Sequence, residues 1–323
     1  MELDLRNRPL AATGRNARLW VERSDDLAEL RKSMSMGFNV LVLADPGAGL
    51  TTFLNWFTAD FEGSGRRSVR RSARRAQNAQ AVLVDLAEAL EQEVPRPPLK
   101  PAGEDGLDLA FQRLSRAAGA TEQEVVVILD DVPGPLGHSL FGTLRDELWS
   151  VDLQWVVGGR VADEGLLLAP PADGFFETVH YLRPLTPEQM LDLLQRRDPR
   201  HLLSSPVRDA IATRARGNPA IALRLAREAA ASHDPEAAVG RGTVIEAVAS
   251  QLGQPAARLA DELARGGATG PSDTDLLRRL GWSRPRAYQV FSQLEAAGFV
   301  TASEERNGQP GRPRKIYRLA GIA

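Results

Sequence analysis

The segment Ala44–Leu54, ADPGAGLTTFL, has the spacing of a phosphate-binding loop. Such loops read G-x-x-x-x-G-K-[ST]: the glycines let backbone N–H groups surround a phosphate, the lysine neutralises the β and γ oxygens, and the hydroxyl reaches magnesium. Ala44 stands at the first glycine position and Leu50 at the lysine position. The amide cradle and the positive end of the following helix remain, so the segment predicts phosphate binding without the usual cation. A glycine-rich turn between a buried strand and a helix is the alternative interpretation.

A second motif, Glu124–Asp131, is an apolar run that ends in two carboxylates, EVVVILDD. Consecutive aliphatic residues are typical of a parallel strand buried on both faces, and ligands of such sheets bind beyond the carboxyl ends of the strands. We expect Asp130 to hold Mg²⁺ together with Thr51, and Asp131 to orient an attacking water if hydrolysis occurs. A polar turn ending a core strand is the alternative. Together the motifs predict binding of ATP or ADP with Mg²⁺, with these loop residues as contacts: Gly47, Ala48, Gly49, Leu50, Thr51 and Thr52.

Strands and helices are expected to alternate through the first half of the chain. We predict strands over 38–43, 124–129, 153–157 and 178–182, and helices over 24–34, 51–61, 78–93, 107–118 and 138–150. This alternation predicts an α/β fold, a parallel-sheet P-loop NTPase domain with helices on both faces. Thr186–Gln189 has the pattern of a capping box and should begin a helical lid domain. Within the lid, Asn218 should cap a helix that opens with Pro219.

The C-terminal region is expected to form a winged helix-turn-helix, with helices over 256–264, 274–280 and 284–297 and strands over 301–303 and 315–319. Ser283 should cap the third helix, whose buried face should comprise Ala287, Val290, Phe291 and Leu294. The predicted domains are therefore 1–183 (P-loop NTPase-like), 184–252 (helical lid) and 253–323 (winged helix).

The third helix of this domain and the hairpin after it carry the residues expected to contact double-stranded DNA. Arginine and glutamine suit base edges in the major groove, and a slim Gly-Arg-Pro-Arg-Lys tip suits the minor groove or its phosphates. A solvated polar face, a basic hairpin and a protein-docking wing are the alternatives. The predicted DNA-binding residues are Arg284, Arg286, Gln289, Gln293, Arg312, Arg314 and Lys315.

Composition limits the other possibilities. The 323 residues include no cysteine, which excludes disulfides and thiol catalysis, and the four histidines lack the spacing of metal ligands. No apolar run approaches the length of a membrane span, so we expect no membrane association and a cytoplasmic protein. Residues 255–323 carry eleven basic against seven acidic residues. A second basic run, Arg66–Arg75, predicts either a phosphate-contacting face or a solvated edge strand and helix entry.

The order of motifs resembles the STAND branch of the AAA+-like P-loop ATPases over roughly residues 15–320. The neighbours of this branch include origin-recognition-type initiators and archaeal-type ATPases with winged helices. Val21–Leu27 is similar to the family's N-terminal motif, with Arg23 retained and Glu22 in place of glycine, and implies a position beside the adenine. The resemblance also implies that Arg160 is the polar sensor at a strand end and that Gly217-Asn218-Pro219 lies near the base. Ala44 and Leu50 depart from the family's pattern.

Three functions are therefore open. The first is a nucleotide-binding, DNA-binding regulator or initiator in which the ATP or ADP state positions the winged helix, with weak or absent hydrolysis. The second is an ATP-hydrolysing switch that forms a homo-oligomer on DNA. The third is a scaffold that docks a protein partner and has a vestigial nucleotide site. Whether the chain hydrolyses ATP depends on whether another cation replaces the lysine that is missing at position 50.

Overall fold

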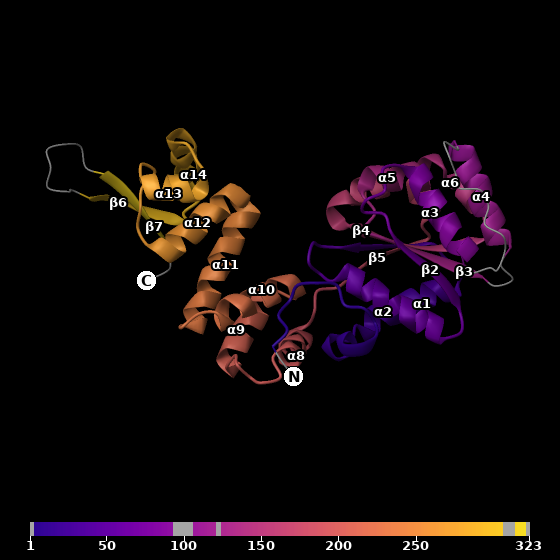
Figure 1. The fold of residues 1–323 in the computed structure, drawn as a ribbon, viewed down its shortest axis with the longest axis horizontal. Coiled ribbons are helices and arrows are strands. Elements are labelled where there is room, and N and C mark those ends of the chain that lie inside the picture. The colour runs from indigo at the N-terminus through magenta and orange to yellow at the C-terminus, as the bar shows by residue number, and fades with distance from the viewer. Residues whose placement is uncertain (1–2, 93–105, 121–123, 306–313, 321–323) are drawn as a thin grey trace. The chain divides into compact units, whose positions relative to one another are not determined.

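The computed structural model describes residues 3–92, 106–120, 124–305 and 314–320 (Figure 1). The chain divides into two compact units. One comprises residues 6–197 and 216–221, and the other comprises residues 1–5, 198–215 and 222–323. The three-domain division, with boundaries after residues 183 and 252, remains a prediction.

The first unit is built on a five-stranded sheet with the order β2-β3-β4-β1-β5. Every neighbouring pair is parallel, and the register places Ser72 opposite Asp130 and Ala44 opposite Arg160, so polar residues meet at the carboxyl edge. The expected α/β fold class is therefore confirmed. The strands are β1 (Val40–Ala44), β2 (Arg67–Ser72), β3 (Val125–Asp130), β4 (Leu153–Arg160) and β5 (Thr178–Tyr181).

Helices cover both faces of this sheet because the strands are apolar on both sides. On one face, α1 (Ser24–Ser35) and α2 (Leu50–Gly63) pack against Val126 and Ile128. On the other, α3 (Ala79–Gln92), α4 (Leu107–Gly119) and the segment after β3 pack against Val127 and Leu129 (Figure 1). The alternation of side chains along a strand thus separates two cores within one sheet.

One part of the sheet unit differs from the prediction. The helix expected over 138–150 is an interrupted segment, α5 (Gly134–His138), η2 (Ser139–Thr143) and α6 (Arg145–Trp149), and it begins earlier because proline occupies its first turn. The arginine-rich run contains β2, which lies at the sheet edge as one of the two interpretations expected, and the phosphate-contacting interpretation stays a prediction. The remaining short elements are η1 (Gly14–Leu19), η3 (Val161–Asp163), α7 (Glu164–Leu167) and η4 (Ala172–Phe175).

The predicted capping box at the start of α8 (Pro187–Arg197) is confirmed. The Thr186 hydroxyl accepts from the backbone N–H of Gln189 at 3.2 Å, and the Gln189 side chain accepts from the N–H of Thr186 at 2.9 Å. The side-chain amide of Gln189 also donates to the carbonyl of Glu22 at 2.8 Å. The box therefore starts the helix and ties it to the segment before α1.

The second unit is helical and ends in an antiparallel hairpin. Helix α10 (Pro219–Ala230) begins in the sheet unit and continues into this one. The described residues contain no helix with the length and hydropathy needed to cross a membrane. The other elements are α9 (Ser205–Ala215), α11 (Pro235–Leu252), α12 (Gln254–Gly266), α13 (Thr274–Leu280), α14 (Arg284–Ala296), β6 (Val300–Glu305) and β7 (Arg314–Leu319).

The last three helices and the hairpin follow the order expected for a winged helix. Helices α12, α13 and α14 share one apolar core with β6 and β7. The predicted buried face of α14 is confirmed, because Ala287, Val290, Phe291 and Leu294 are all buried. The predicted cap is not: Ser283 holds the N-cap position, but its hydroxyl makes no capping hydrogen bond, and its carbonyl accepts from the backbone N–H of Ala287 instead.

Candidate nucleotide site and candidate DNA-contacting surface

The predicted phosphate loop joins β1 to α2 in the conformation that its glycines allow. Gly47 has φ 84° and Gly49 has φ 93°, both in the left-handed region that favours glycine. Gly49 is the N-cap of α2, so the first-turn amides of that helix face the loop. The Thr52 hydroxyl accepts from the backbone N–H of Leu10 at 3.1 Å and so holds the N-terminal segment.

Arg23 holds this loop by a hydrogen bond to one of its backbone carbonyls. Its guanidinium donates to the carbonyl of Ala48 at 2.7 Å and to that of Arg183 at 2.5 Å, and it pairs with Asp26 at 3.4 Å. The side chain is only 5% exposed, and this burial lowers the pKa of Arg23 despite the neighbouring carboxylate. Arg23 was predicted to lie beside the adenine, and the structure gives it a direct role in holding the loop carbonyl.

The start of α10 contacts the same loop. The Asn218 side chain caps this helix, as predicted, by accepting from the N–H groups of Ala220 and Ile221 at 3.0 and 3.2 Å. Its amide nitrogen also donates to the carbonyl of Pro46 at 2.9 Å, and the N–H of Ala220 donates to that of Gly47 at 3.3 Å. Pro219 occupies the first helical position, as predicted. The lid segment and the phosphate loop are therefore hydrogen-bonded to each other.

Gly47 permits that contact as well as the turn. A Cβ at this position would lie 2.7 Å from the Cβ of Ala220 and 2.9 Å from Oδ1 of Asn218. Any larger residue would push α10 off the loop. The glycine is thus required both by its backbone angle and by the approach of a second element.

Leu50 turns its side chain towards the sheet. It is partly buried and packs on the core that α1 and α2 form with the strands. A Cβ on Gly158 in β4 would lie 3.4 Å from both Cδ2 of Leu50 and Oδ1 of Asp130. The apolar side chain at the lysine position therefore ends beside Gly158, the glycine that also adjoins Oδ1 of Asp130.

Asp130 is buried at the end of β3 and is partnered by arginine. It is 2% exposed, and its Oδ2 accepts from Nη2 of Arg70 at 2.5 Å. Burial raises the pKa of Asp130, and this effect exceeds the lowering by Arg70 and by the nearby Thr51 hydroxyl. Thr51 and Asp130, predicted as the magnesium pair, therefore lie together, and Arg70 is a third member of the cluster.

Asp131 faces two other arginines. Its backbone is in the left-handed region, with φ 53°, a conformation that aspartate tolerates better than most residues. Its carboxylate lies 3.3 Å from Nη2 of Arg160 and 3.6 Å from Nε of Arg74. Arg160 thus stands at the end of β4, where the sensor residue was predicted, and contacts the acid predicted to orient water.

The residues present fit a nucleoside polyphosphate with one magnesium ion. Oδ1 of Asp130 is buried and has no hydrogen-bond partner among the described residues, which leaves an acceptor that a cation would satisfy. The Thr51 hydroxyl lies beside the same carboxyl group, and the glycine loop offers amides to phosphate. Thr51 and Asp130 would hold the metal, and the loop and the helix N-terminus would hold the phosphates.

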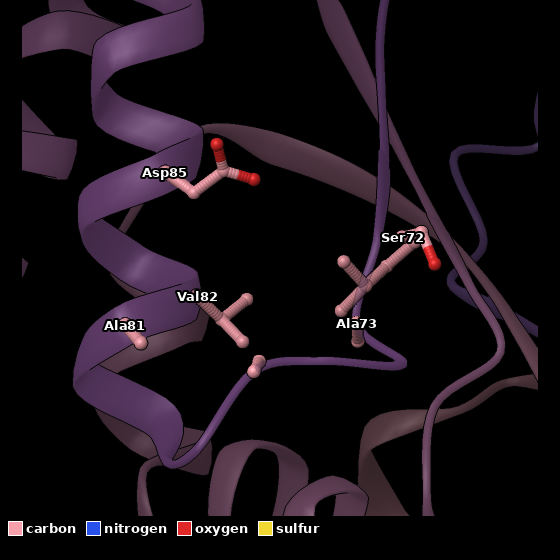
Figure 2. A pocket seen from close by; sticks show the side chains of 7 residues that line it. Ser72, Ala73, Ala81, Val82 and Asp85 are labelled. Carbon is pink, nitrogen blue, oxygen red and sulfur yellow. The ribbon is translucent and has the colours of Figure 1, made fainter.

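A small cavity lies on the opposite face of β2 and β3, and the sequence did not predict it (Figure 2). Its volume is about 160 Å³, and Leu129 and Ala73, which belong to the core on the α3 side, form part of its wall. Asp85 on α3 also lines the cavity. Its carboxylate pairs with Arg71 at 3.4 Å. The cavity has no residue of the glycine loop in its lining, so it is separate from the candidate nucleotide site.

The two arginines that contact the carboxylates from the β2 side, Arg70 and Arg74, belong to the basic run that the sequence marked as a possible phosphate-contacting face, but they were not assigned to either carboxylate. The signal was present, because the pairs of the arginine run recur every fourth residue. What could not be read is the register: Arg70 lies on the face of β2 that looks towards α2, whereas Arg71 lies on the other face. Only strand pairing decides which arginine meets which carboxylate.

In the second unit, α14 exposes the predicted polar face. Arg284, Arg286, Gln289 and Gln293 are all exposed, opposite the buried apolar face of the helix. The guanidinium of Arg286 lies 5.2 Å from the ring centroid of Trp282, a cation–π distance that orders this side chain. The structure therefore gathers four of the predicted DNA-binding residues on one helix.

The predicted wing residues are only partly described. Lys315 in β7 pairs with Glu295 of α14 at 2.9 Å, and the hydrogen bond that its ammonium donates to this carboxylate raises the pKa of Lys315. Arg312 lies outside the described residues, and for Arg314 only the backbone is described, as the first residue of β7. The expected contribution of these two arginines stays a prediction.

No protein-family profile and no curated protein sequence matches this chain. Its structure is similar to Cdc6p from Pyrobaculum aerophilum, with TM-score 0.53 and 16% identity over 95% of this chain and 94% of that one. It is also similar to Aeropyrum pernix ORC1 in complex with DNA, with TM-score 0.51 and 18% identity over 93% and 89% of the two chains. A third similar structure is Aeropyrum pernix ORC2 with ADPNP and ADP, with TM-score 0.51 and 14% identity over 98% and 92%. The chain therefore shares the fold of these Orc1, ORC2 and Cdc6 proteins.

Proposed function

We propose that this protein binds ATP or ADP, with Mg²⁺, at the glycine loop and double-stranded DNA through a winged helix, and that it acts as a nucleotide-responsive regulator or initiator. The observation that carries the proposal is the pair of hydrogen bonds from the start of α10 to the loop carbonyls of Pro46 and Gly47. Because α10 is one continuous helix, a ligand that displaces this contact moves the helix that leads into the second compact unit. Nucleotide state can thereby set the presentation of the DNA-contacting domain.

The nucleotide half of the proposal is supported by the loop itself. The amides of a glycine loop and of a helix N-terminus bind phosphate without needing a side chain. The structure of Aeropyrum pernix ORC2, which shares this fold, contains ADPNP and ADP. A bound nucleotide would place the negative charge of its phosphates beside Thr51, Asp130 and the surrounding arginines.

The contacts of Asp131 support binding with weak or absent hydrolysis. A carboxylate that orients an attacking water must accept that water's proton or hydrogen bond. Here the carboxylate of Asp131 is already engaged by Arg160 and Arg74, and Leu50 supplies no charge to the β and γ phosphates. The site therefore favours a ligand-gated switch over rapid turnover.

The DNA half of the proposal is supported by α14 and its neighbours. Exposed arginine and glutamine at the start and middle of the third helix are suited to a major groove. The structure of Aeropyrum pernix ORC1, which shares the fold, is a complex with DNA. Arg312, Arg314 and Lys315 would add contacts to the minor groove or to phosphates.

The test measures DNA binding with and without nucleotide. Titration calorimetry of the full chain with ATP and ADP in magnesium should give heat of binding, and fluorescence anisotropy with duplex DNA should give an affinity that changes on saturation with nucleotide. Replacement of Arg312 and Arg314 by alanine should weaken DNA binding and flatten its salt dependence. A chain that binds neither nucleotide would disprove the proposed site, and DNA affinity that ignores bound nucleotide would disprove the coupling.

A further inference from the structure

Arg70 is the cation nearest to the buried carboxylate of the candidate nucleotide site. Its Nη2 lies 2.5 Å from Oδ2 of Asp130, and the side chain is 24% exposed. Its Nε is buried and has no hydrogen-bond partner among the described residues. One N–H of this guanidinium is therefore committed to Asp130, and another lies in the interior without an acceptor.

The position of Arg70 follows from the register of the edge strand. In the pairing of β2 with β3, Arg70 stands opposite Ile128, on the sheet face that also carries α2 and its N-terminal loop. Asp130 contacts Arg70 through one oxygen, and its other oxygen lies beside Gly158, where the tip of Leu50 also ends. Arg70 therefore contacts the carboxyl group directly, whereas the uncharged side chain of Leu50 ends beside the neighbouring Gly158.

We propose that Arg70 replaces the missing loop lysine and is the side chain that supplies positive charge to the β-phosphate of a bound nucleotide. This inference rests on the proposed nucleotide binding. In this assignment, the positive charge that usually comes from a lysine in the loop comes instead from an arginine on the edge strand β2. Guanidinium is suited to this work because its several N–H groups can keep one contact with Asp130 and offer others to a phosphate.

Arg71 provides a matched control on the same strand. It is the next residue along β2, but it lies on the opposite face and pairs with Asp85. Asp85 lines the separate cavity (Figure 2). Loss of Arg71 removes the same charge from the same strand without touching the carboxylate cluster. A general electrostatic effect would appear in both variants, whereas a phosphate contact appears only for Arg70.

The experiment is titration calorimetry of the full chain with ADP and with AMP. We expect Arg70→Gln, which can still hydrogen-bond to Asp130, to weaken ADP binding roughly 10- to 100-fold, because a hydrogen bond to a charged group is lost. AMP, which has no β-phosphate, should bind almost equally to the wild type and to Arg70→Gln. Arg71→Gln should bind ADP as the wild type does. Thermal unfolding of each variant shows that the compared proteins are folded.

A second variant tests replacement directly. Leu50→Lys restores the usual loop cation, so Leu50→Lys combined with Arg70→Gln should recover most of the lost ADP affinity, which a purely structural role of Arg70 would not allow. Equal loss for ADP and AMP, or no recovery by Leu50→Lys, would overturn the assignment. If the wild type binds ADP and Arg70→Gln binds it equally well, this inference fails while the proposed nucleotide site stands. If the wild type binds no nucleotide, both fail.

Discussion

Asn218 and Pro46 are joined by a hydrogen bond of 2.9 Å from the asparagine side chain to the backbone carbonyl of the phosphate loop. The same asparagine caps α10 through its Oδ1. One side chain therefore starts the helix with its oxygen and holds the loop with its nitrogen. A ligand that changes the conformation of the loop would therefore also change the contacts of Asn218, the residue that caps α10.

The two functions of Asn218 can be separated by substitution. Asn218→Ala removes both and should lower the free energy of unfolding by about 1–2 kcal/mol, whereas Asn218→Asp keeps a good cap and should retain most stability. The aspartate variant would, however, place a carboxylate against the Pro46 carbonyl and near the phosphates, so we expect ADP affinity to fall in both variants. Urea unfolding and calorimetry measure the two effects. Asp234→Ala, which removes the α11 cap on the N–H of Ala237, is the control and should leave ADP binding unchanged.

Gly47 should tolerate substitution less well than a glycine of the same backbone angle elsewhere. Gly65 has φ 83° and nothing within 4 Å of an added Cβ, so Gly65→Ala should destabilise by about 1–2 kcal/mol through backbone strain alone. Gly47→Ala carries the same strain and also meets Ala220 and Asn218. Urea unfolding should show a larger loss for Gly47→Ala. Equal losses in the two variants would show that α10 does not rest on the loop in solution.

Asp130 should make stability depend on pH in the direction set by its raised pKa. Burial is the main cause of that rise. Because the folded carboxyl group binds its proton more tightly than the unfolded one, its contribution to stability is full below the unfolded pKa, about 4, and is lost as the pH rises through the folded value. Asp130→Asn cannot ionise, so its advantage in unfolding free energy over the wild type should grow as the pH rises from about 4 to 7. Urea unfolding at several pH values measures this.

Asp26 should make the free energy of unfolding depend on pH in the opposite direction. Burial raises the pKa of Asp26, but the hydrogen bond with His180 and the charges of Arg23, His180 and Arg183 outweigh it, so the net pKa is lowered. The stability that Asp26 contributes is present above the unfolded pKa and is lost as the pH falls through the folded value. The disadvantage of Asp26→Asn relative to the wild type should therefore shrink in acid. If the two variants showed pH slopes of the same sign, at least one of the two assignments would be wrong.

We expect the charged residues on the exposed face of α14 to contribute to DNA affinity, and we expect salt to weaken that contribution. Arg284→Ala should weaken binding to duplex DNA and make the slope of log affinity against log salt shallower by about 1 if its guanidinium contacts a phosphate. Arg265→Ala on α12 is the matched control, because Arg265 is exposed and pairs with Asp261 at 2.8 Å within its own helix. Fluorescence anisotropy at several salt concentrations measures the slope. The same change in slope for both variants would indicate an effect of net charge rather than of α14.

Local patterns were enough to predict most of the elements that build the site. The apolar runs of β1 and β3, the glycine loop, the capping box at Thr186 and the Asn218 cap all depend on residues within a few positions of one another. Each is specified by side-chain period or by one hydrogen bond over a short separation, so each can be recognised before the chain folds. The buried face of α14 followed from helical spacing in the same way.

Contacts between distant segments required the tertiary structure. Arg70 and Asp130 are sixty residues apart, and Arg23 and Ala48 are twenty-five apart. The basic run before α3 shows six arginines of equal chemistry, and a shift of one residue in the pairing of β2 would turn Arg71, rather than Arg70, towards the carboxylate. Motif spacing therefore predicted a phosphate loop that lacks its lysine and a pair of carboxylates at the end of a neighbouring strand. The pairing of an edge strand with its neighbour, a choice made by packing across the whole sheet, decided which cation stands beside them.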